Sequence, residues 1–260
     1  MFESLKEIGQ YRSMVRNLVK REVRGRYKGS VLGFFWNFIL PLIQILVYIM
    51  VFTQIFRSDL DNYAVYLVSG MVLWIWFSDS ISEGSGTIVA NSDMVKKIYF
   101  PRAILPVSIT LSKMVNFVIT LAIFFIIIAV LNHGFEPLAL MCLPLAILIS
   151  LFFILGMSIL LSAINVYLRD TQYIVTVVLM AWVWLTPIMY SRNFIDNAMI
   201  NDFLALNPMT HFVALFQDIL YWKVVPDLLD IFVCAALAAG MMIIGCAVFK
   251  YLERDFAEVL

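Results

Sequence analysis

Six long apolar runs constrain the fold of this chain more than any other feature. Each run is close to the ~20 residues that an α-helix needs to cross ~30 Å of hydrocarbon. The whole chain is 63% hydrophobic and only 14% charged, whereas a soluble domain needs more charge to cover its surface. We therefore predict an all-α polytopic membrane protein, a single transmembrane domain with six transmembrane helices at 34–56, 63–80, 104–131, 138–166, 173–190 and 229–251.

The amino-terminal segment, residues 1–30, has the pattern of an amphipathic helix. Apolar residues recur at helical spacing from Phe2 to Val23, and arginine and lysine occupy positions between them. A basic amphipathic helix of this kind suits the surface of an anionic membrane. We predict an interface helix here, and Gly29 and Gly33 then let the chain turn into the membrane.

The distribution of lysine and arginine predicts the orientation. If the amino end is cytoplasmic, so are the segments 1–33, 83–103, 167–172 and 250–260, which hold every basic residue except Arg57, Lys113, Arg192 and Lys223. Cytoplasmic loops carry the excess of basic residues in membrane proteins. Both termini are therefore predicted to be cytoplasmic.

The segment 194–222 is too polar for a seventh span and too apolar for an ordinary loop. It contains two short apolar stretches, which Asn207 and Pro208 divide. Two short helices that dip into the outer leaflet and return would fit this pattern, provided that protein or water shields the break. We predict an outer re-entrant helix pair.

The sequence contains no pattern of a catalytic or metal site. His133 and His211 have no second ligand at metal-binding spacing, and the phosphate-binding loop Gly-x-x-x-x-Gly-Lys-[Ser/Thr] does not occur. The three cysteines lie in apolar runs, where small packed side chains are expected. An intramembrane hydrolase would need a serine that faces His211 across a cavity. We expect no enzyme activity, no catalytic residue, no metal ion and no cofactor bound by this chain.

Few ionisable residues fall within the predicted spans. Asp79 and Glu83 lie near the inner end of the second span, and Lys113 lies in the first turns of the third. Charges within a membrane suggest function, but near an interface they also snorkel or pair, so both interpretations stay open. The spans lack the charged relays that proton- or sodium-driven transporters carry near the midplane. If the chain transports a substrate, we expect the energy to come from a partner.

Residues 91–100 form a second cytoplasmic element that suits such a partner. Ser92 or Asp93 is expected to cap a short helix, and Pro101 is expected to end it. A helix lying flat under the membrane suits a cleft in a cytoplasmic protein. The alternative for this element and for the amino-terminal helix is anchoring to the membrane surface.

Aromatic residues make up 15% of the chain, and three of them recur along one helix face. Tyr48, Phe52 and Phe56 are spaced every four residues in the first span. Such a row is typical of helix–helix packing. Its alternative is the lining of a conduit, where aromatic faces stack on sugar rings without holding any one sugar tightly.

Four stretches of the sequence resemble the polysaccharide-export permeases of ABC transporters, the membrane subunits that export lipid-linked O-antigen and wall teichoic acid. The first is RYKGSVLGFFW at 26–36, followed by Pro41 and the Tyr48–Phe52 pair. The others, in the same order as in the family, are KKIYFPR at 96–102, VYLRD at 166–170 and NPMT at 207–210. The match extends over essentially the whole chain.

The resemblance implies a homodimer in the cytoplasmic (inner) membrane of a bacterium, with two copies of a separate cytoplasmic ATPase subunit that binds ATP and Mg²⁺. Residues 1–24 would be the interface helix and 91–100 the coupling helix, both meeting that ATPase. The outer re-entrant pair would lie near the exit. The implied coupling residues are Asp93, Met94, Val95, Lys96, Lys97 and Tyr99.

The resemblance also implies the substrate, an undecaprenyl-pyrophosphate-linked glycan threaded processively through a continuous channel. The first and fifth spans would line it, so the channel candidates are Tyr48, Phe52, Phe56, Trp182 and Trp184. Arg24, Arg26, Lys28 and Arg102 would receive the pyrophosphate at the inner mouth, or would only anchor the chain by the positive-inside rule. The alternatives are an ABC-type exporter of a drug or small lipid, and a membrane enzyme or scaffold. Membrane lipids are expected partners, and nucleic acid is not.

Overall fold

Every regular element in the described part of the chain is helical. The computed structural model describes residues 11–25, 35–54, 60, 62–190, 202 and 204–260. In chain order the elements are α2 (Arg12–Gly25), α3 (Trp36–Gln54), α4 (Tyr63–Ala90), α5 (Ser92–Lys97), α6 (Ile104–Val130), α7 (Pro137–Leu140), α8 (Leu143–Tyr167), α9 (Thr171–Trp182), α11 (Pro208–Gln217), the π-helical turn η3 (Asp218–Trp222), α12 (Leu228–Leu252), the 3₁₀ turn η4 (Glu253–Asp255) and α13 (Phe256–Val259).

Four helical segments are long and apolar enough to cross a membrane. They are Tyr63–Ala90, Ile104–Val130, Pro137–Tyr167 and Leu228–Asp255. They correspond to the second, third, fourth and sixth predicted spans. The first and fifth predicted spans contain the shorter apolar helices Ile39–Tyr48 and Thr171–Trp182, so the count of six spans stays a prediction.

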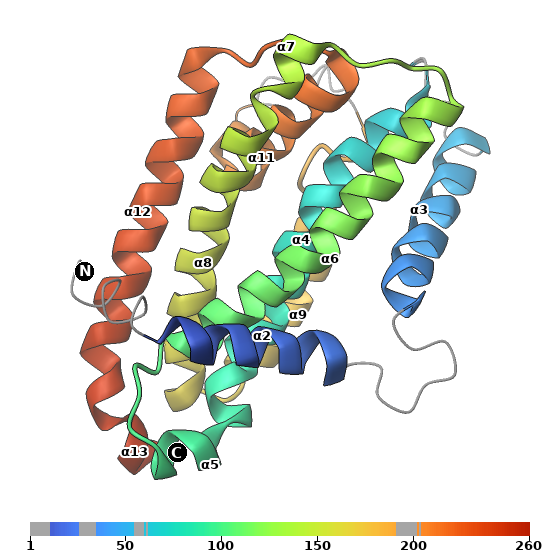
Figure 1. Cartoon of the computed structure of the whole chain (residues 1–260). Coiled ribbons are helices and arrows are strands. Elements are labelled where there is room, and N and C mark those ends of the chain that lie inside the picture. Colours follow the sequence, from blue (N-terminus) through green and yellow to red (C-terminus); the bar gives the residue numbers. More distant parts are fainter. Residues whose placement is uncertain (1–10, 26–34, 55–59, 61, 191–201, 203) are drawn as a thin grey trace.

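Helix α4 is the central helix of the bundle. Its most apolar window is 78% buried, whereas the corresponding windows of the other three long helices are 22–39% buried. In Figure 1, α4, α6, α8 and α12 run side by side, and α3 lies beside α6 at the edge. The sequence predicted that the second span ends at Ser80, but α4 continues to Ala90.

The polar inner part of α4 stays helical because close neighbours bury it. A side-chain carbon on Gly84 would come within 2.1 Å of the Ser158 hydroxyl oxygen of α8, and one on Gly86 within 2.6 Å of the Gln172 amide oxygen of α9. With any larger residue at these positions, the Ser158 and Gln172 side chains would have to move. The polar composition of this stretch therefore marks close helix contacts and does not mark a loop.

Helix α9 ends at Trp182, whereas the predicted span continued to Tyr190. Pro187 lies just beyond, and the residue before a proline is driven out of the helical region. The Thr186 hydroxyl donates to the Trp182 carbonyl oxygen at 2.9 Å, which satisfies one of the acceptors that a helix end leaves unpaired. Residues 183–190 consequently form turns.

Helices α8 and α12 cross at a pair of glycines. A side-chain carbon on Gly245 would lie 2.2 Å from the Gly156 carbonyl oxygen, and one on Gly156 would lie 2.6 Å from the Met242 backbone nitrogen. The two backbones are therefore in direct contact, as small residues allow in membrane helix pairs.

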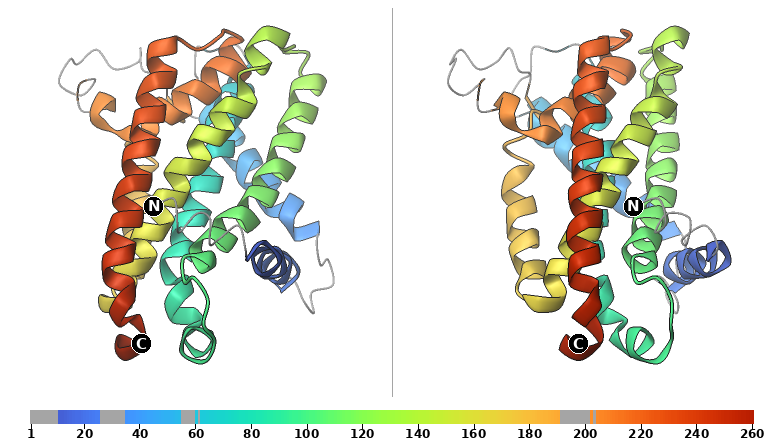
Figure 2. Two further views of the ribbon diagram at one scale, coloured as in Figure 1. Left: turned by 60° about the vertical axis from the view of Figure 1, so that its left-hand side comes forward. Right: turned by 90° about the vertical axis from the view of Figure 1, so that its left-hand side faces the viewer.

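The two ends of the bundle carry different short elements. Figures 1 and 2 show α5 and α13 at one end and α7 and α11 at the other, while α2 lies outside the bundle and roughly across it. The α2 helix lies within the predicted interface helix 1–30, whose residues 1–10 and 26–30 fall outside the described residues. Within the predicted outer pair 194–222, the described residues are the helical residues 202 and 204–206, followed by Asn207, α11 and η3.

Candidate functional site

The short helix α5 is attached directly to the inner end of α4. A single residue, Asn91, separates the two helices, and its side-chain amide donates to the Thr87 carbonyl oxygen at 2.8 Å. The helix begins at Ser92 and its last residue is Lys97, within the predicted 91–100. Val95 and Phe100 are buried, so α5 is held against the rest of the chain by its apolar side.

The opposite side of α5 presents polar and aromatic groups to solvent. Asp93, Lys96 and Lys97 are exposed, and the ion pair between Asp93 and Lys97 at 3.8 Å is too exposed to contribute much stability. Beyond the helix, Ile98 is 56% exposed and Tyr99 is 96% exposed. A fully exposed tyrosine beside an isoleucine has the composition of a protein–protein contact.

Helix α2 packs against α6 and is hydrogen-bonded to the residue that joins α4 to α5. Leu18 of α2 is buried in the same cluster as Ile88, Val95 and Phe100, and the Arg21 guanidinium donates to the Asn91 side-chain oxygen at 2.9 Å. The predicted interface helix and the predicted coupling helix therefore share one apolar cluster. Neither Arg21 nor Asn91 was among the predicted site residues.

Arg102 is engaged within the chain. Its guanidinium donates to the backbone carbonyl oxygen of Glu253 and lies 5.7 Å from the centroid of the Phe256 ring. It thus ties the loop after α5 to the carboxyl-terminal turn, a role that the sequence did not indicate. Of the other predicted pyrophosphate ligands, Arg24 is exposed on α2, while Arg26 and Lys28 lie outside the described residues.

Lys113 forms an ion pair with Glu83 between α6 and α4. The lysine side chain is only 2% exposed, and burial of an unpaired ammonium would cost several kcal/mol. The structure therefore favours pairing, one of the two interpretations that the sequence left open. Asp79 lies one turn away on α4.

The channel candidates fall into three groups. Tyr48 is half-buried in α3 and packs against the main core. Trp184 is 57% exposed. The Phe52 side chain and the whole of Phe56 lie outside the described part of the chain. Trp182 packs inward, with its ring centroid 5.5 Å from that of Phe77 and 6.5 Å from that of Trp74. The exposed face of α9 is apolar, with Tyr173, Ile174, Val177, Val178 and Met180.

The Asn207 side chain makes four hydrogen bonds at the outer end. Its side-chain oxygen accepts from the Trp182 indole N–H at 2.8 Å and from the Met209 backbone N–H at 3.0 Å. Its amide nitrogen donates to the Leu185 carbonyl oxygen at 2.9 Å and to the Thr186 hydroxyl oxygen at 3.1 Å. The Asn-Pro pair is an ordinary helix start, with Asn207 as cap and Pro208 at the first position, and this signal was readable from the sequence.

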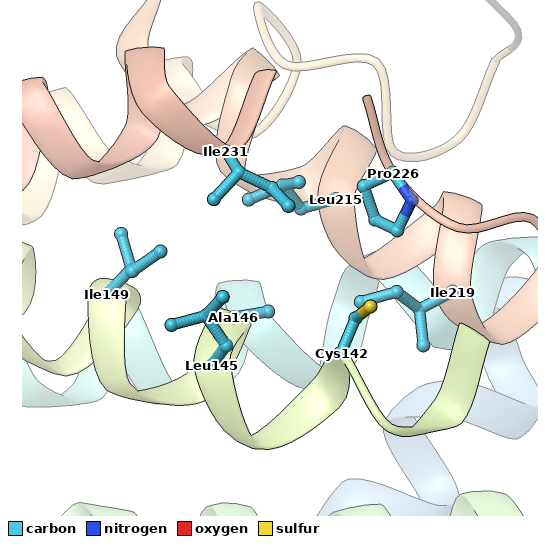
Figure 3. A pocket seen from close by; sticks show the side chains of 8 residues that line it. All are labelled: Cys142, Leu145, Ala146, Ile149, Leu215, Ile219, Pro226 and Ile231. Atoms are coloured by element: carbon cyan, nitrogen blue, oxygen red, sulfur yellow. The ribbon is translucent and has the colours of Figure 1, made fainter. Parts of the chain in front are cut away.

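The histidines and a small crevice complete the outer end. Within the described part of the chain, no three His, Cys, Asp or Glu residues are grouped as metal ligands would be. The His133 ring stacks on Tyr221, and a His211 ring nitrogen lies 2.9 Å from the Ala205 carbonyl oxygen. A crevice of about 10 Å³ between α8, α11, η3 and α12 has only apolar lining and room for at most one water (Figure 3). It is far too small for a substrate.

Comparison with known proteins defines the family. The model of the ABC-2 type transporter family matches residues 14–221, from α2 through η3. The chain belongs to this family. It is therefore a membrane permease subunit, and the multi-pass architecture agrees with that assignment.

Its relatives are export permeases. The chain is 33% identical over 204 residues to the O-antigen export system permease protein RfbA of Myxococcus xanthus. The matched stretch covers 78% of each of the two chains. It is 26% and 27% identical over 206 residues, again 78% of each chain, to two proteins of the same name from Klebsiella pneumoniae.

Proposed function

We propose that this chain is the channel-forming membrane subunit of an ATP-driven exporter of lipid-linked polysaccharide. The observation that carries the proposal is the 33% identity with an O-antigen export permease over 78% of both chains. The family match extends over residues 14–221, so it includes both α5 with its extension and the proposed exit.

The partner in this proposal is a separate ATPase subunit. ABC-2 permeases normally work with one, and this sequence has no phosphate-binding loop of its own. The docking surface is the exposed side of α5 and its extension, with Asp93, Met94, Lys96, Lys97 and Tyr99 as contacts. Val95 supports them from the buried side. Tyr99 is the proposed anchor, since aromatic residues dominate the energy of such contacts.

The conduit forms between two copies of the chain. Helices α3 and α9 carry apolar faces that the described part of the chain leaves exposed, and exposed aromatics include Tyr173 of α9 and Trp184 just beyond it. Flat aromatic faces stack on successive sugars without binding any one of them strongly. A polymer is too long for a single enclosed pocket, so the proposal is processive threading along Tyr48, Phe52, Phe56 and Trp184. Trp182 acts in the wall behind them.

The inner mouth faces the cytoplasm in this proposal, with both termini on that side. The carboxyl-terminal turn lies beside α5 (Figure 1), and the predicted inner segments hold most of the lysine and arginine. Arg24, Arg26 and Lys28 receive the pyrophosphate of the lipid carrier. Arg102 holds the docking loop and reaches the carrier only if it leaves Glu253.

The test is reconstitution with the ATPase subunit that co-purifies with this chain. The purified complex is placed in vesicles with lipid-linked O-polysaccharide, and the glycan reaching the opposite face is measured with an impermeant glycan-cleaving enzyme. We expect transfer with ATP and none with an ATPase variant that cannot hydrolyse it. Transfer of a small lipid but not of the polymer would favour the drug or lipid exporter, and turnover of a substrate without nucleotide would favour an enzyme.

A further inference from the structure

Asn207 connects two elements that are separate in the sequence, the end of α9 and the start of α11. Its side chain makes four hydrogen bonds, two to Trp182 and Met209 through the oxygen and two to Leu185 and Thr186 through the nitrogen. An asparagine amide has two N–H donors and an oxygen that accepts two bonds. Its bonding capacity is therefore used completely.

The orientation of this amide is fixed by its neighbours. An indole N–H can only donate, so the Trp182 side chain must face the oxygen. A backbone carbonyl can only accept, so Leu185 must face the nitrogen. Aspartate would turn a carboxylate oxygen toward the Leu185 carbonyl, and serine could cap α11 but could not reach across to Trp182.

The elements on both sides of the link are firmly packed. The Trp182 ring meets Phe77 of α4 edge-on, at 88° between the ring planes. On the other side, Phe212 of α11 packs on Phe153 of α8, with ring centroids 4.7 Å apart. A displacement at either side is therefore passed to the amide and is not absorbed by loose side chains.

We infer that Asn207 is a positioning residue for export, which sets α11 at a fixed distance and angle from the end of α9. A shift of α9 then carries α11 with it, and the outer end of the conduit changes together with its wall. This inference rests on the proposed function, because it takes α9 as conduit wall and α11 as part of the exit. The hydrogen-bonded link itself is testable without export.

The first experiment measures the link directly. The native cysteines of the full chain are replaced, and spin labels are placed at Val178 and Leu206, which are both exposed. The distance between the two labels is measured by double electron–electron resonance. We expect one narrow distance distribution, which Asn207→Ser broadens at least twofold. Ala205→Ser, at an exposed position beside the label, serves as the control and should leave the distribution narrow. An unchanged distribution in Asn207→Ser would overturn the inference.

The second experiment separates positioning from simple stability. In the reconstituted complex, Asn207→Ser should lower the polysaccharide exported per ATP hydrolysed at least fivefold while the hydrolysis rate stays within twofold of wild type. Leu228→Ser, at an exposed position outside the proposed conduit and exit, should leave the ratio unchanged. Trp182→Phe keeps an aromatic ring but loses the N–H that bonds to Asn207. As a single substitution it should lower the ratio, and the double variant with Asn207→Ser should export no less than Asn207→Ser itself.

Two results would refute positioning by Asn207: a wild-type ratio in Asn207→Ser, or effects of the two substitutions that add in full. If the wild-type complex exports no polysaccharide at all, the proposed function fails, whereas the distance measurement still decides whether Asn207 holds α11 to α9.

Discussion

The glycine contact between α8 and α12 supplies the sharpest prediction of stability. In Gly245→Ala the new side-chain carbon would lie 2.2 Å from the Gly156 carbonyl oxygen. Ordinary contacts begin near 3.4 Å, so the helices must separate by roughly 1 Å at the crossing. The obstacle is backbone, which cannot rotate away as the end of a long side chain can.

The expected cost follows from overpacking. Insertion of a methyl group into a well-packed interface costs typically 1–3 kcal/mol, and the close packing that holds membrane helices together without a hydrophobic driving force is lost as well. Gly240 in the same helix has nothing within 4 Å of the corresponding position. Gly240→Ala should therefore stabilise the helix by ~0.5–1 kcal/mol, because alanine loses less conformational entropy than glycine.

The two variants make a matched pair, one methyl group each in one helix. The melting temperature in detergent can be measured from the size-exclusion profile after heating. We expect the melting temperature of Gly245→Ala to be roughly 3–10 °C below that of wild type, and that of Gly240→Ala to equal or slightly exceed it. Gly156→Ala should resemble Gly245→Ala, and the double variant should fall less than the sum, since both disturb one contact. If Gly245→Ala melts as high as Gly240→Ala, the helices are not in backbone contact and the reasoning is refuted.

Three further predictions concern charges and the docking surface. Lys113→Met should destabilise the chain by less than the ~3 kcal/mol expected for a fully buried pair, because the Glu83 side chain is 36% exposed, and Lys113→Met with Glu83→Gln should recover part of the loss in the same melting assay. Tyr99→Ala should weaken co-purification of the ATPase roughly tenfold, a loss of ~1.4 kcal/mol in binding free energy, without changing the melting temperature. The control is Leu206→Ala, a substitution of an exposed apolar residue at the other end of the bundle. An equal loss of co-purification in both variants would contradict a specific contact at Tyr99. Arg102→Gln should release the carboxyl-terminal turn, so that limited proteolysis removes residues after Leu252 faster than in wild type, and an unchanged cleavage rate would show that the guanidinium bond to Glu253 holds nothing in place.

Sequence patterns predicted the long apolar helices because hydrophobic length is a local property. Three of the long spans follow directly from composition. The short helix was predicted over 91–100, but it starts after Asn91 without a side-chain cap and ends at Lys97, before Pro101. The inner half of α4 was missed for a physical reason. Serine, glycine and glutamate between Ser80 and Ala90 are polar, yet Gly84 and Gly86 serve contacts with α8 and α9 that only the folded arrangement reveals.

The candidate site was harder to predict, since its contacts join distant parts of the chain. Arg102 reads as one more basic residue at the inner face, and its bond to Glu253 connects residues 151 positions apart. Asn207 is readable as a helix cap, but its bond to Trp182 depends on which helix end lies opposite. The glycines Gly156 and Gly245 are visible in their apolar runs, while their pairing is not.

The unbroken length of α4 has a mechanical consequence. At 1.5 Å per residue its 28 residues span ~42 Å, about 12 Å more than the hydrocarbon layer. The helix carries α5 at one end, and at the other the hydroxyls of Tyr63 and Tyr66 donate to the carbonyl oxygens of Met189 and Tyr190 at 2.7 and 2.9 Å. If α4 tilts as a rigid rod of this length, a tilt of about 5° about one end displaces the other end by roughly 4 Å. In the proposed exporter, force applied to α5 by the ATPase would therefore reach the turn beyond α9 through one unbroken helix.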